Sequence, residues 1–373
     1  MSSTQKRPDG RWRARYRDAA GKEHSKHFGR KVDASRWLDE VTASVVTGAY
    51  ADPKLGRRTV ADWYVQWWPS TVNLRPSTRH RDASLYQTHV LPALGHRPLG
   101  AVKQPEIVAL VAALTAKGLG PATVTKTAQL VGKLFGAAVD AGLLGLSPYR
   151  RVPLPRVERE EMRFLNPGEV ARLADVIEPR YRALVLVAAY AGLRIGELAG
   201  LRRSRVDLLR GTVEVIDIVT EVAGVVAVGP PKTKASRRRV ALPRRVVDAL
   251  GEHMAAFTDP LPDAYVFTSS GGGVLRRSGF RSRHWTAATR AAGLEGLRVH
   301  DLRHTAVALW IASGANVKDV SVRAGHTSAS FTIDRYGHRF DSADDALAAR
   351  LNAIYEEGPV TAPVVKITRT LAD

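Results

Sequence analysis

The chain contains no cysteine among its 373 residues, which excludes disulfide bonds and thiolate metal sites. It also lacks an apolar run long enough to span a bilayer, so no membrane anchor is expected. The first residues, Met1 to Asp9, are polar and lead into arginines, unlike a secretory signal peptide. No repeat of solenoid period and no low-complexity tract is visible. These absences favour a globular protein of a reducing cytoplasm.

Acidic residues are few relative to basic ones. The 56 Lys and Arg residues outnumber 36 Asp and Glu residues, which gives a formal net charge of +20 at pH 7. A charge this positive indicates a polyanionic partner, and nucleic acid fits better than a membrane surface because no basic amphipathic anchor is present. The length and a hydrophobic content of 45% predict two or three domains with cores of their own.

The first segment alternates arginine with apolar residues. The arginines fall on every second position, at Arg11, Arg13, Arg15 and Arg17. In a strand, this pattern places four guanidinium groups on one face and an apolar row on the other. A returning strand over 22–28 and a helix over 31–47 complete a small sheet backed by one helix. We interpret the arginine face as a DNA contact; an ordinary solvated edge strand is the alternative.

The block from about Thr59 to Ser147 is predicted to be all-helical. Thr59 can cap its first helix, the second spans 75–90, and prolines 105 and 121 begin the third and fourth. An apolar stripe from Val124 to Ala138 is expected to be core packing. Arg79 and Lys126 are candidate phosphate contacts, although scattered basic residues on helices are usually only solvated.

A proline-rich, charged stretch over 147–163 suits an extended connector. Asn166 and Glu169 then supply the two halves of a capping box around a proline at the first helical position. β-Branched runs at 212–220, 225–228 and 239–242 predict a small antiparallel sheet. Further helices are predicted over 181–189, 243–257, 278–292, 302–313, 317–324, 328–336 and 343–355. The tail contains a strand-like run at 364–368 that could dock on a neighbouring subunit.

Five short motifs follow one another in this third part of the chain. They are Gly-Leu-Arg-x-Gly-Glu with Arg194, a strand turn with Lys232, His-Asp-Leu-Arg-His-Thr with His300 and Arg303, Gly-His with His326, and Asp-Arg-Tyr-Gly-His with Tyr336. If a helix begins near Leu302, His300 and Arg303 lie about one turn apart and face the same way. Together these residues form a set suited to metal-free chemistry on a phosphodiester.

On these motifs the chain resembles the tyrosine recombinases of the phage integrase type, over nearly its whole length. The resemblance implies a multidomain, mainly α fold: an arm-binding ββ(β)α domain over 1–52, a helical core-binding domain over 58–150, an α+β catalytic domain over 160–357 and a tail over 358–373. It implies site-specific recombination through a 3′-phosphotyrosyl link and a Holliday junction, without cofactor or metal. The implied partners are core-type and arm-type attachment DNA, a homotetramer, and possible host DNA-bending and directionality factors at the nucleoid.

The chemistry of the residues agrees with this resemblance. A phenol has a pKa of about 10, so Tyr336 needs help to attack phosphorus at neutral pH. Arg194 and Arg303 are expected to hold the phosphoryl oxygens with their planar forks. His300 is expected to take the tyrosine proton or to hold the phosphate.

The remaining roles come from the resemblance. Lys232 resembles the family's general acid for the leaving 5′ oxygen, because Lys-Thr-x-x-Ser-x-Arg is the family's usual context, and Lys234 is the alternative. His326 is expected to donate to a phosphoryl oxygen. Glu197 is expected to orient His300 or Arg303 without entering the reaction.

Other interpretations remain. His304 is expected to cap or pack, although it could touch the phosphate, His338 could lie behind the site, and Tyr190 is expected to pack. A metal-dependent nuclease would need clustered carboxylates, and no acidic triad is apparent because Asp301 belongs to the histidine-arginine motif. An architectural DNA binder would explain the charge but not the motifs. A type IB topoisomerase would share the nucleophile, but the arginine-rich first domain favours a recombinase.

Overall fold

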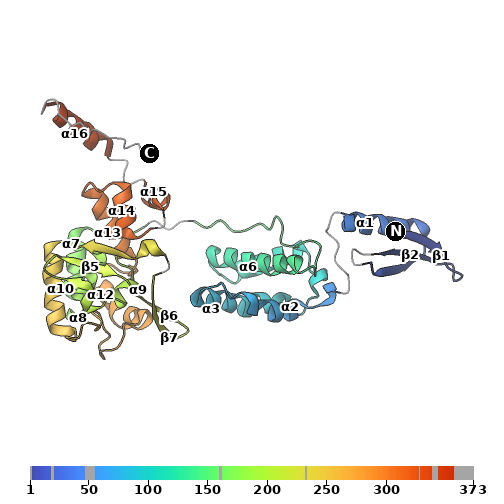
Figure 1. Ribbon diagram of the computed structural model, residues 1–373, viewed down its shortest axis with the longest axis horizontal. Coiled ribbons are helices and arrows are strands. Elements are labelled where there is room, and N and C mark those ends of the chain that lie inside the picture. Colours follow the sequence, from blue (N-terminus) through green and yellow to red (C-terminus); the bar gives the residue numbers. More distant parts are fainter. Residues whose placement is uncertain are drawn as a thin grey trace, which may run out of the picture. The chain divides into compact units, whose positions relative to one another are not determined.

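The computed structural model describes residues 2–17, 21–46, 55–158, 162–231, 233–326, 328–337 and 343–356. Lys232, His338 and the tail over 358–373 therefore lie outside the described residues. The chain divides into two compact units, residues 1–160 and 161–373. Both are built mainly from helices with small antiparallel sheets, as the sequence predicts (Figure 1).

The first unit begins with a three-stranded antiparallel sheet and one helix. Its elements are β1 (Ser3–Lys6), β2 (Trp12–Arg17), β3 (Glu23–Phe28) and α1 (Lys31–Val46), with strand order β1-β2-β3. Ala14 and Tyr16 on β2 are buried together with Ala34 and Leu38 on α1, so the apolar row of the alternating segment faces the helix. The polar sequence of β1 does not predict a strand; it pairs with β2 from Ser3 opposite Arg15.

The rest of the first unit is helical. Its elements are η1 (Leu55–Arg57), α2 (Val60–Trp67), η2 (Trp68–Ser70), α3 (Pro76–Leu85), the π-helical turn η3 (Tyr86–Val90), α4 (Leu91–Leu94), η4 (Leu99–Ala101), α5 (Gln104–Ala116) and α6 (Pro121–Asp140). Thr59 caps α2 as expected, its hydroxyl accepting from the backbone N–H of Asp62 at 3.1 Å. The stripe on α6 is buried, with Val124, Leu134 and Phe135 fully covered, which confirms its role in packing.

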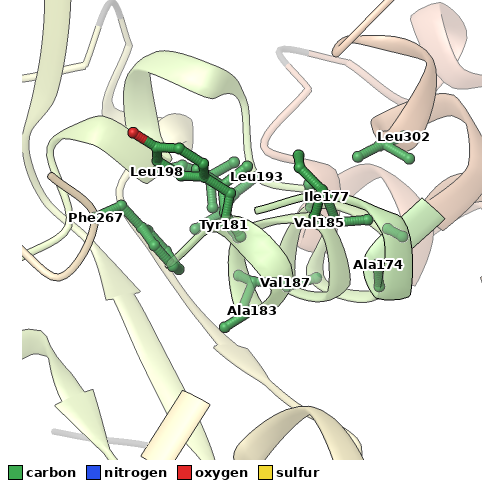
Figure 2. Close-up of a cluster of buried hydrophobic side chains, with 14 of the residues drawn as sticks. Ala174, Ile177, Tyr181, Ala183, Val185, Val187, Leu193, Leu198, Phe267 and Leu302 are labelled. Carbon is green, nitrogen blue, oxygen red and sulfur yellow. The ribbon is translucent and has the colours of Figure 1, made fainter. Parts of the chain in front are cut away.

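The second unit is built around α8. Its helical elements are α7 (Pro167–Val176), α8 (Pro179–Ala191), α9 (Ile195–Ala199), η5 (Arg203–Arg205), η6 (Lys234–Ser236), α10 (Arg244–Phe257), α11 (Arg277–Phe280), the π-helical turn η7 (Arg281–Trp285), α12 (Thr286–Ala291), α13 (Asp301–Ala312), α14 (Val317–Ala324), α15 (Ala329–Tyr336) and α16 (Ala343–Glu356). The side chains of α8 are buried against α7, α10 and α13, and Figure 2 shows part of this core. The expected capping box begins α7, because Asn166 and Glu169 exchange two 2.9 Å hydrogen bonds.

Two small sheets replace the single sheet that the sequence predicts in this unit. One contains β4 (Val206–Asp207), β5 (Thr212–Val215) and β8 (Arg238–Ala241), and the other pairs β6 (Ile218–Val222) with β7 (Val225–Gly229). The expected strand over 212–220 is interrupted because β5 pairs with β8 whereas β6 turns back onto β7. The prediction of one continuous strand was therefore wrong.

Two glycines bring β6 close to α9. A Cβ atom on Gly196 would lie 2.7 Å from the Val219 carbonyl oxygen, and one on Gly200 would lie 2.7 Å from that of Asp217. Any side chain at these positions would push the strand away from the helix. The close approach fixes α9, which carries Arg194 and Glu197 at its N-terminal end.

Candidate active site

Arg194 lies at the junction of α8 and α9. Gly192 ends α8 in the left-handed conformation, with φ of 66°, and turns the chain so that Arg194 becomes the N-cap of α9. The Arg194 guanidinium donates to Glu197 Oε1 at 2.7 Å and to the Gly325 carbonyl at 3.4 Å. The side chain remains 37% exposed, so its outer edge is available to a ligand.

Glu197 is 2% exposed and orients two arginines. Besides Arg194 it accepts from the guanidinium of Arg238, at 2.9 Å to Oε2 and 3.2 Å to Oε1. Burial opposes ionisation, but the hydrogen bond and charge of Arg238, together with Arg194, lower the pKa of Glu197 below its ordinary value. The motif predicts that this carboxylate orients His300 or Arg303, whereas its side-chain hydrogen bonds go to Arg194 and Arg238.

Arg238 is a site residue that the sequence analysis did not single out. Its side chain is 5% exposed and also donates to the carbonyls of Arg323 at 2.7 Å and Ser236 at 3.0 Å. It therefore connects β8 to α9 and to the end of α14. The sequence does contain a motif that could have indicated Arg238, because this residue is the last one of the Lys-Thr-x-x-Ser-x-Arg motif that begins at position 232.

Arg303 is 3% exposed on the first turn of α13. One terminal nitrogen donates to the Gly192 carbonyl at 2.6 Å, and the other donates to the Ala324 carbonyl. Burial, reinforced by the charge of Arg194, lowers the pKa of Arg303 to about 9, so the side chain stays protonated at neutral pH. Asp301, the first residue of the same helix, is held by Arg298, whose backbone N–H donates to Oδ2 at 2.8 Å.

His300 precedes α13 and remains accessible to solvent. Desolvation, with the positive charges of Arg303 and Arg194, lowers the pKa of His300 to about 4. Its ring packs edge to face against His304, with centroids 4.9 Å apart. His300 and Arg303 thus lie one helical turn apart, as the sequence predicts, and both are neighbours of Arg194.

The hydroxyl of Tyr336 makes a 2.6 Å hydrogen bond with Nδ1 of His304. Both side chains are buried, with Tyr336 1% and His304 4% exposed. Burial raises the pKa of Tyr336, and the charges of Arg303, Arg335 and Arg194 oppose that rise. From the sequence, His304 was expected to cap or pack, with contact to the phosphate as the alternative, because its position next to Arg303 in the motif does not reveal which way its ring points.

His326 lies beside the tyrosine at the end of α14. Its ring is parallel to that of Tyr336, at 7° and 6.4 Å between centroids, and its Nδ1 lies 2.8 Å from the Thr332 hydroxyl. Burial and the charges of Arg303 and Arg194 lower the pKa of His326 to about 3, so the ring is neutral at pH 7. When Nδ1 accepts from Thr332, Nε2 carries the hydrogen and can donate to an oxygen of a ligand.

The predicted DNA-contact residues lie in the first unit, and most of their side chains contact other residues of that unit. Arg13 and Arg17 lie 3.5 and 3.8 Å from Glu23, and Arg15 donates to Ser3, whereas Arg11 is exposed. Arg79 lies over the Trp68 ring and within 3.4 Å of two backbone carbonyls, and Lys126 lies 3.9 Å from the buried Asp82. Lys232, the expected acid, and the side chain of Lys234 are outside the described residues.

No described helix has the length and apolar character needed to cross a bilayer. Across the described ranges, no group of three or more His, Asp or Glu side chains is placed to hold a metal ion. Among the described residues, the structure brings together three guanidinium groups, those of Arg194, Arg238 and Arg303, with three histidine rings and the Tyr336 phenol. Three of the helices that carry them, α13, α14 and α15, lie next to one another (Figure 1).

Comparison with known proteins places this arrangement in a family. Residues 163–343 match the phage integrase family, and residues 3–47 match the phage integrase N-terminal domain. The putative prophage phiRv2 integrase of Mycobacterium tuberculosis is 27% identical over 361 residues, which cover 93% of this chain and 94% of the relative. The integrase of Mycobacterium phage D29 is also 27% identical, over 88% of this chain and 89% of its own.

Solved structures show the same fold. The Tn1549 transposon integrase in complex with a circular intermediate DNA has a TM-score of 0.68 at 20% identity, covering 79% of this chain and 99% of that one. A lambda integrase dimer bound to a COC′ core site has a TM-score of 0.58 at 17% identity, covering 90% and 95%. The chain belongs to the phage integrase family of tyrosine recombinases, and it is a site-specific recombination enzyme.

Proposed function

We propose that this chain integrates or excises a phage or mobile element, and that Tyr336 is the residue that becomes joined to the DNA. The phenol attacks the scissile phosphorus, a 3′-phosphotyrosyl link forms and a 5′-hydroxyl is released. That hydroxyl then attacks the link on a partner strand, so the energy of the broken bond is kept without a high-energy cofactor. Two such exchanges pass through a Holliday junction.

The observation that carries this proposal is the placement of the Tyr336 phenol. Its ring is stacked on His326, and the charges of Arg303 and Arg194 of the same chain act on it. In the transition state negative charge spreads over the phosphoryl oxygens, and preorganised cations and N–H donors are what stabilise it. We assign Arg194, Arg303 and His326 to those oxygens, His300 to holding the phosphate, and Lys232 to protonating the 5′ oxygen.

Glu197 and Arg238 are positioning residues in this scheme. Neither needs to touch the DNA, because Glu197 holds the Arg194 guanidinium from behind and Arg238 holds Glu197. The exposed edge of Arg194 then faces a ligand in a fixed orientation, which is how bidentate phosphate recognition is achieved.

The assembly is proposed as a homotetramer on two DNA sites in the host cell, at the nucleoid. The structure of a lambda integrase tetramer bound to a Holliday junction, with a TM-score of 0.55 and 18% identity over 88% of this chain, supports that state. The arginine row of β2, with Arg11, is proposed to bind arm-type DNA, and Arg79 and Lys126 core-type DNA. A host DNA-bending factor and a directionality factor are further proposed partners.

The test is a covalent-trapping experiment with Tyr336→Phe. Binding sites are first selected from a random DNA pool, and a half-site with a nick near the cleavage point is then incubated with protein. The wild type should give a complex that survives denaturant, whereas Tyr336→Phe should bind DNA equally well and trap none. Tyr190→Phe is the matched control, because Tyr190 contributes only its backbone carbonyl to the contact with Trp310. A wild-type level of adduct with Tyr336→Phe would overturn the assignment.

A second measurement separates recombination from topoisomerase activity. The chain should join two attachment sites and leave supercoiled DNA without such sites intact. Relaxation of site-free supercoiled DNA at a rate comparable to joining would favour the type IB topoisomerase alternative. Deleting residues 1–50 should spare cleavage of the core-type half-site while weakening assembly on longer attachment DNA.

A further inference from the structure

We propose that His304 is a catalytic residue, whose Nδ1 accepts the phenolic proton of Tyr336 as the tyrosine attacks the scissile phosphate. This inference rests on the proposed function, because it gives the nucleophile of that reaction its base. It differs from the expectation drawn from the sequence, in which His300 takes the tyrosine proton or holds the phosphate.

The contact is short and enclosed. His304 Nδ1 and the Tyr336 hydroxyl are 2.6 Å apart, within the distance that a proton transfer requires. The two residues come from different helices, α13 and α15, so the contact depends on their packing and not on sequence proximity. His300, by comparison, contacts the ring of His304, whereas within the described residues the Tyr336 hydroxyl is hydrogen-bonded to His304.

The direction of the hydrogen bond follows from the charge state of His304. Burial, the neighbouring His300 and the charge of Arg335 lower the pKa of His304 to about 4, so the ring is neutral at pH 7. In the tautomer with its hydrogen on Nε2, Nδ1 offers a lone pair to the phenolic O–H. The phenol oxygen then directs its own lone pairs away from His304 and towards an incoming electrophile.

The groups around His304 also explain how DNA would activate it. They are Asp301 on its own helix, Arg298 and His300 before that helix, Arg335 and Tyr336 on α15, and His326 after α14. His300, Arg335 and Arg298 disfavour a positive charge on the His304 ring, and Asp301 favours one. A phosphodiester bound by Arg194 and Arg303 brings a negative charge that offsets them and raises the proton affinity of His304. The base would therefore become effective only when its substrate is bound.

The step balances. The Tyr336 oxygen forms a bond to phosphorus while the bond from phosphorus to the 5′ oxygen breaks, the phenolic proton moves to His304 Nδ1, and the 5′ oxygen takes a proton from Lys232 in the proposed scheme. Rejoining reverses each transfer: the attacking 5′-hydroxyl returns its proton to the lysine, and His304 returns the proton to the departing phenol. The two residues end each cycle as they began it.

Two variants separate a base from a positioning group. His304→Asn places an amide oxygen near the position of Nδ1, so it can still accept from the phenol but cannot take a proton to form a cation. His304→Ala removes both functions. Rates of covalent complex formation are measured on the nicked half-site from pH 6 to pH 9, beside wild type and Lys232→Ala, after circular dichroism has shown that each variant folds.

A substrate with sulfur in place of the bridging 5′ oxygen separates defects in tyrosine activation from defects in leaving-group protonation. Its leaving group is a thiolate, which departs without prior protonation because the pKa of a thiol is about 8.5. Lys232→Ala should be rescued by this substrate. His304→Asn should be slowed about 100-fold or more on both substrates, as expected for loss of general base catalysis. Its rate should rise about tenfold per pH unit towards the phenol pKa, whereas the wild-type rate should change little over the same range.

Three results would overturn the proposal: a His304→Asn rate within about twofold of wild type, a slowed rate whose pH profile is parallel to wild type, or an increased rate. The last would show that the contact restrains Tyr336 instead of activating it. Covalent adduct from Tyr336→Phe would instead refute the proposed function itself, so the two failures are distinguishable.

Discussion

Removing the carboxylate of Glu197 should destabilise the second unit and disable cleavage together. Glu197→Ala leaves the guanidinium of Arg238, which is 5% exposed, without its anion. Breaking a buried ion pair from one side costs about 3–5 kcal/mol, and the two carbonyls that still accept from Arg238 place the expected value near the lower end. Arg194 loses its 2.7 Å restraint at the same time, so its outer edge is no longer held towards the phosphate.

A double variant distinguishes stability from orientation. Glu197→Leu combined with Arg238→Met replaces both charges with apolar groups of similar volume, and such replacements are often neutral for stability. We expect most of the lost stability to return in the double variant while cleavage stays slow, because Arg194 is still unrestrained. Matched single variants complete the cycle.

The free energy of unfolding is measured from hydrogen exchange of the buried amides of α8, and cleavage from the nicked half-site. The pH dependence of stability gives a further test of this contribution. The pKa of Glu197 is lowered in the fold, so its stabilising contribution is present above the unfolded value of about 4.3 and is lost as the pH falls through the folded value. A loss of under about 1 kcal/mol in the free energy of unfolding of Glu197→Ala would contradict the stabilising role of Glu197. Wild-type cleavage by the double variant would contradict its role in orienting Arg194.

Three further predictions concern other parts of the chain. Gly192→Ala should destabilise the protein by at least about 1–2 kcal/mol in urea denaturation, because φ is 66° and the new Cβ would lie 2.7 Å from the Trp310 ring. The control Gly136→Ala adds its Cβ in open space within α6 and should stabilise the protein by about 0.5–1 kcal/mol. Equal effects of the two substitutions would contradict this prediction. The buried His304 and His326 have pKa values lowered to about 4 and about 3, so on acidification the unfolded chain binds protons before the folded one. The urea midpoint should therefore fall as the pH drops from about 6.5 towards 4, and His304→Asn should make that fall shallower. An unchanged dependence of the midpoint on pH in His304→Asn would contradict the lowered pKa of His304. Arg15→Gln should reduce the slope of the logarithm of the binding constant against the logarithm of the salt concentration by about 1 on arm-type DNA. Arg13→Gln should change this slope less, because the guanidinium of Arg13 is already paired with Glu23. Equal changes would show that this ion pair does not persist on DNA.

Local signals in the sequence predicted most of the elements, because those signals act over a few residues. Thr59, Asn166 and the apolar stripe of α6 carry capping and periodicity information in their own neighbourhoods, and the structure confirms each. The interrupted strand over 212–220 shows the limit. Its β-branched run is continuous, but β6 pairs with β7 across a tight turn, whereas β5 pairs with β8, which follows that hairpin in the sequence.

The site divides in the same way. Spacing alone could place His300 and Arg303 on one face of a helix start, and the structure agrees. It could not show that Glu197 binds Arg238, 41 residues away, or that the His304 ring reaches Tyr336 across two helices. Such contacts depend on the packing of α9, β8, α13 and α15, which no local pattern encodes.

The two carbonyls that hold Arg303 have a consequence for biosynthesis. They belong to Gly192 and Ala324, at the ends of α8 and α14, so the guanidinium acquires its fixed direction only after both helices have folded against α13. A ribosome makes α14 and α15 late, so a growing chain carries its arginine-rich first unit long before the contacts that orient Arg303 exist. An incomplete polypeptide would therefore lack both the oriented guanidinium and the Tyr336 phenol that the proposed cleavage needs.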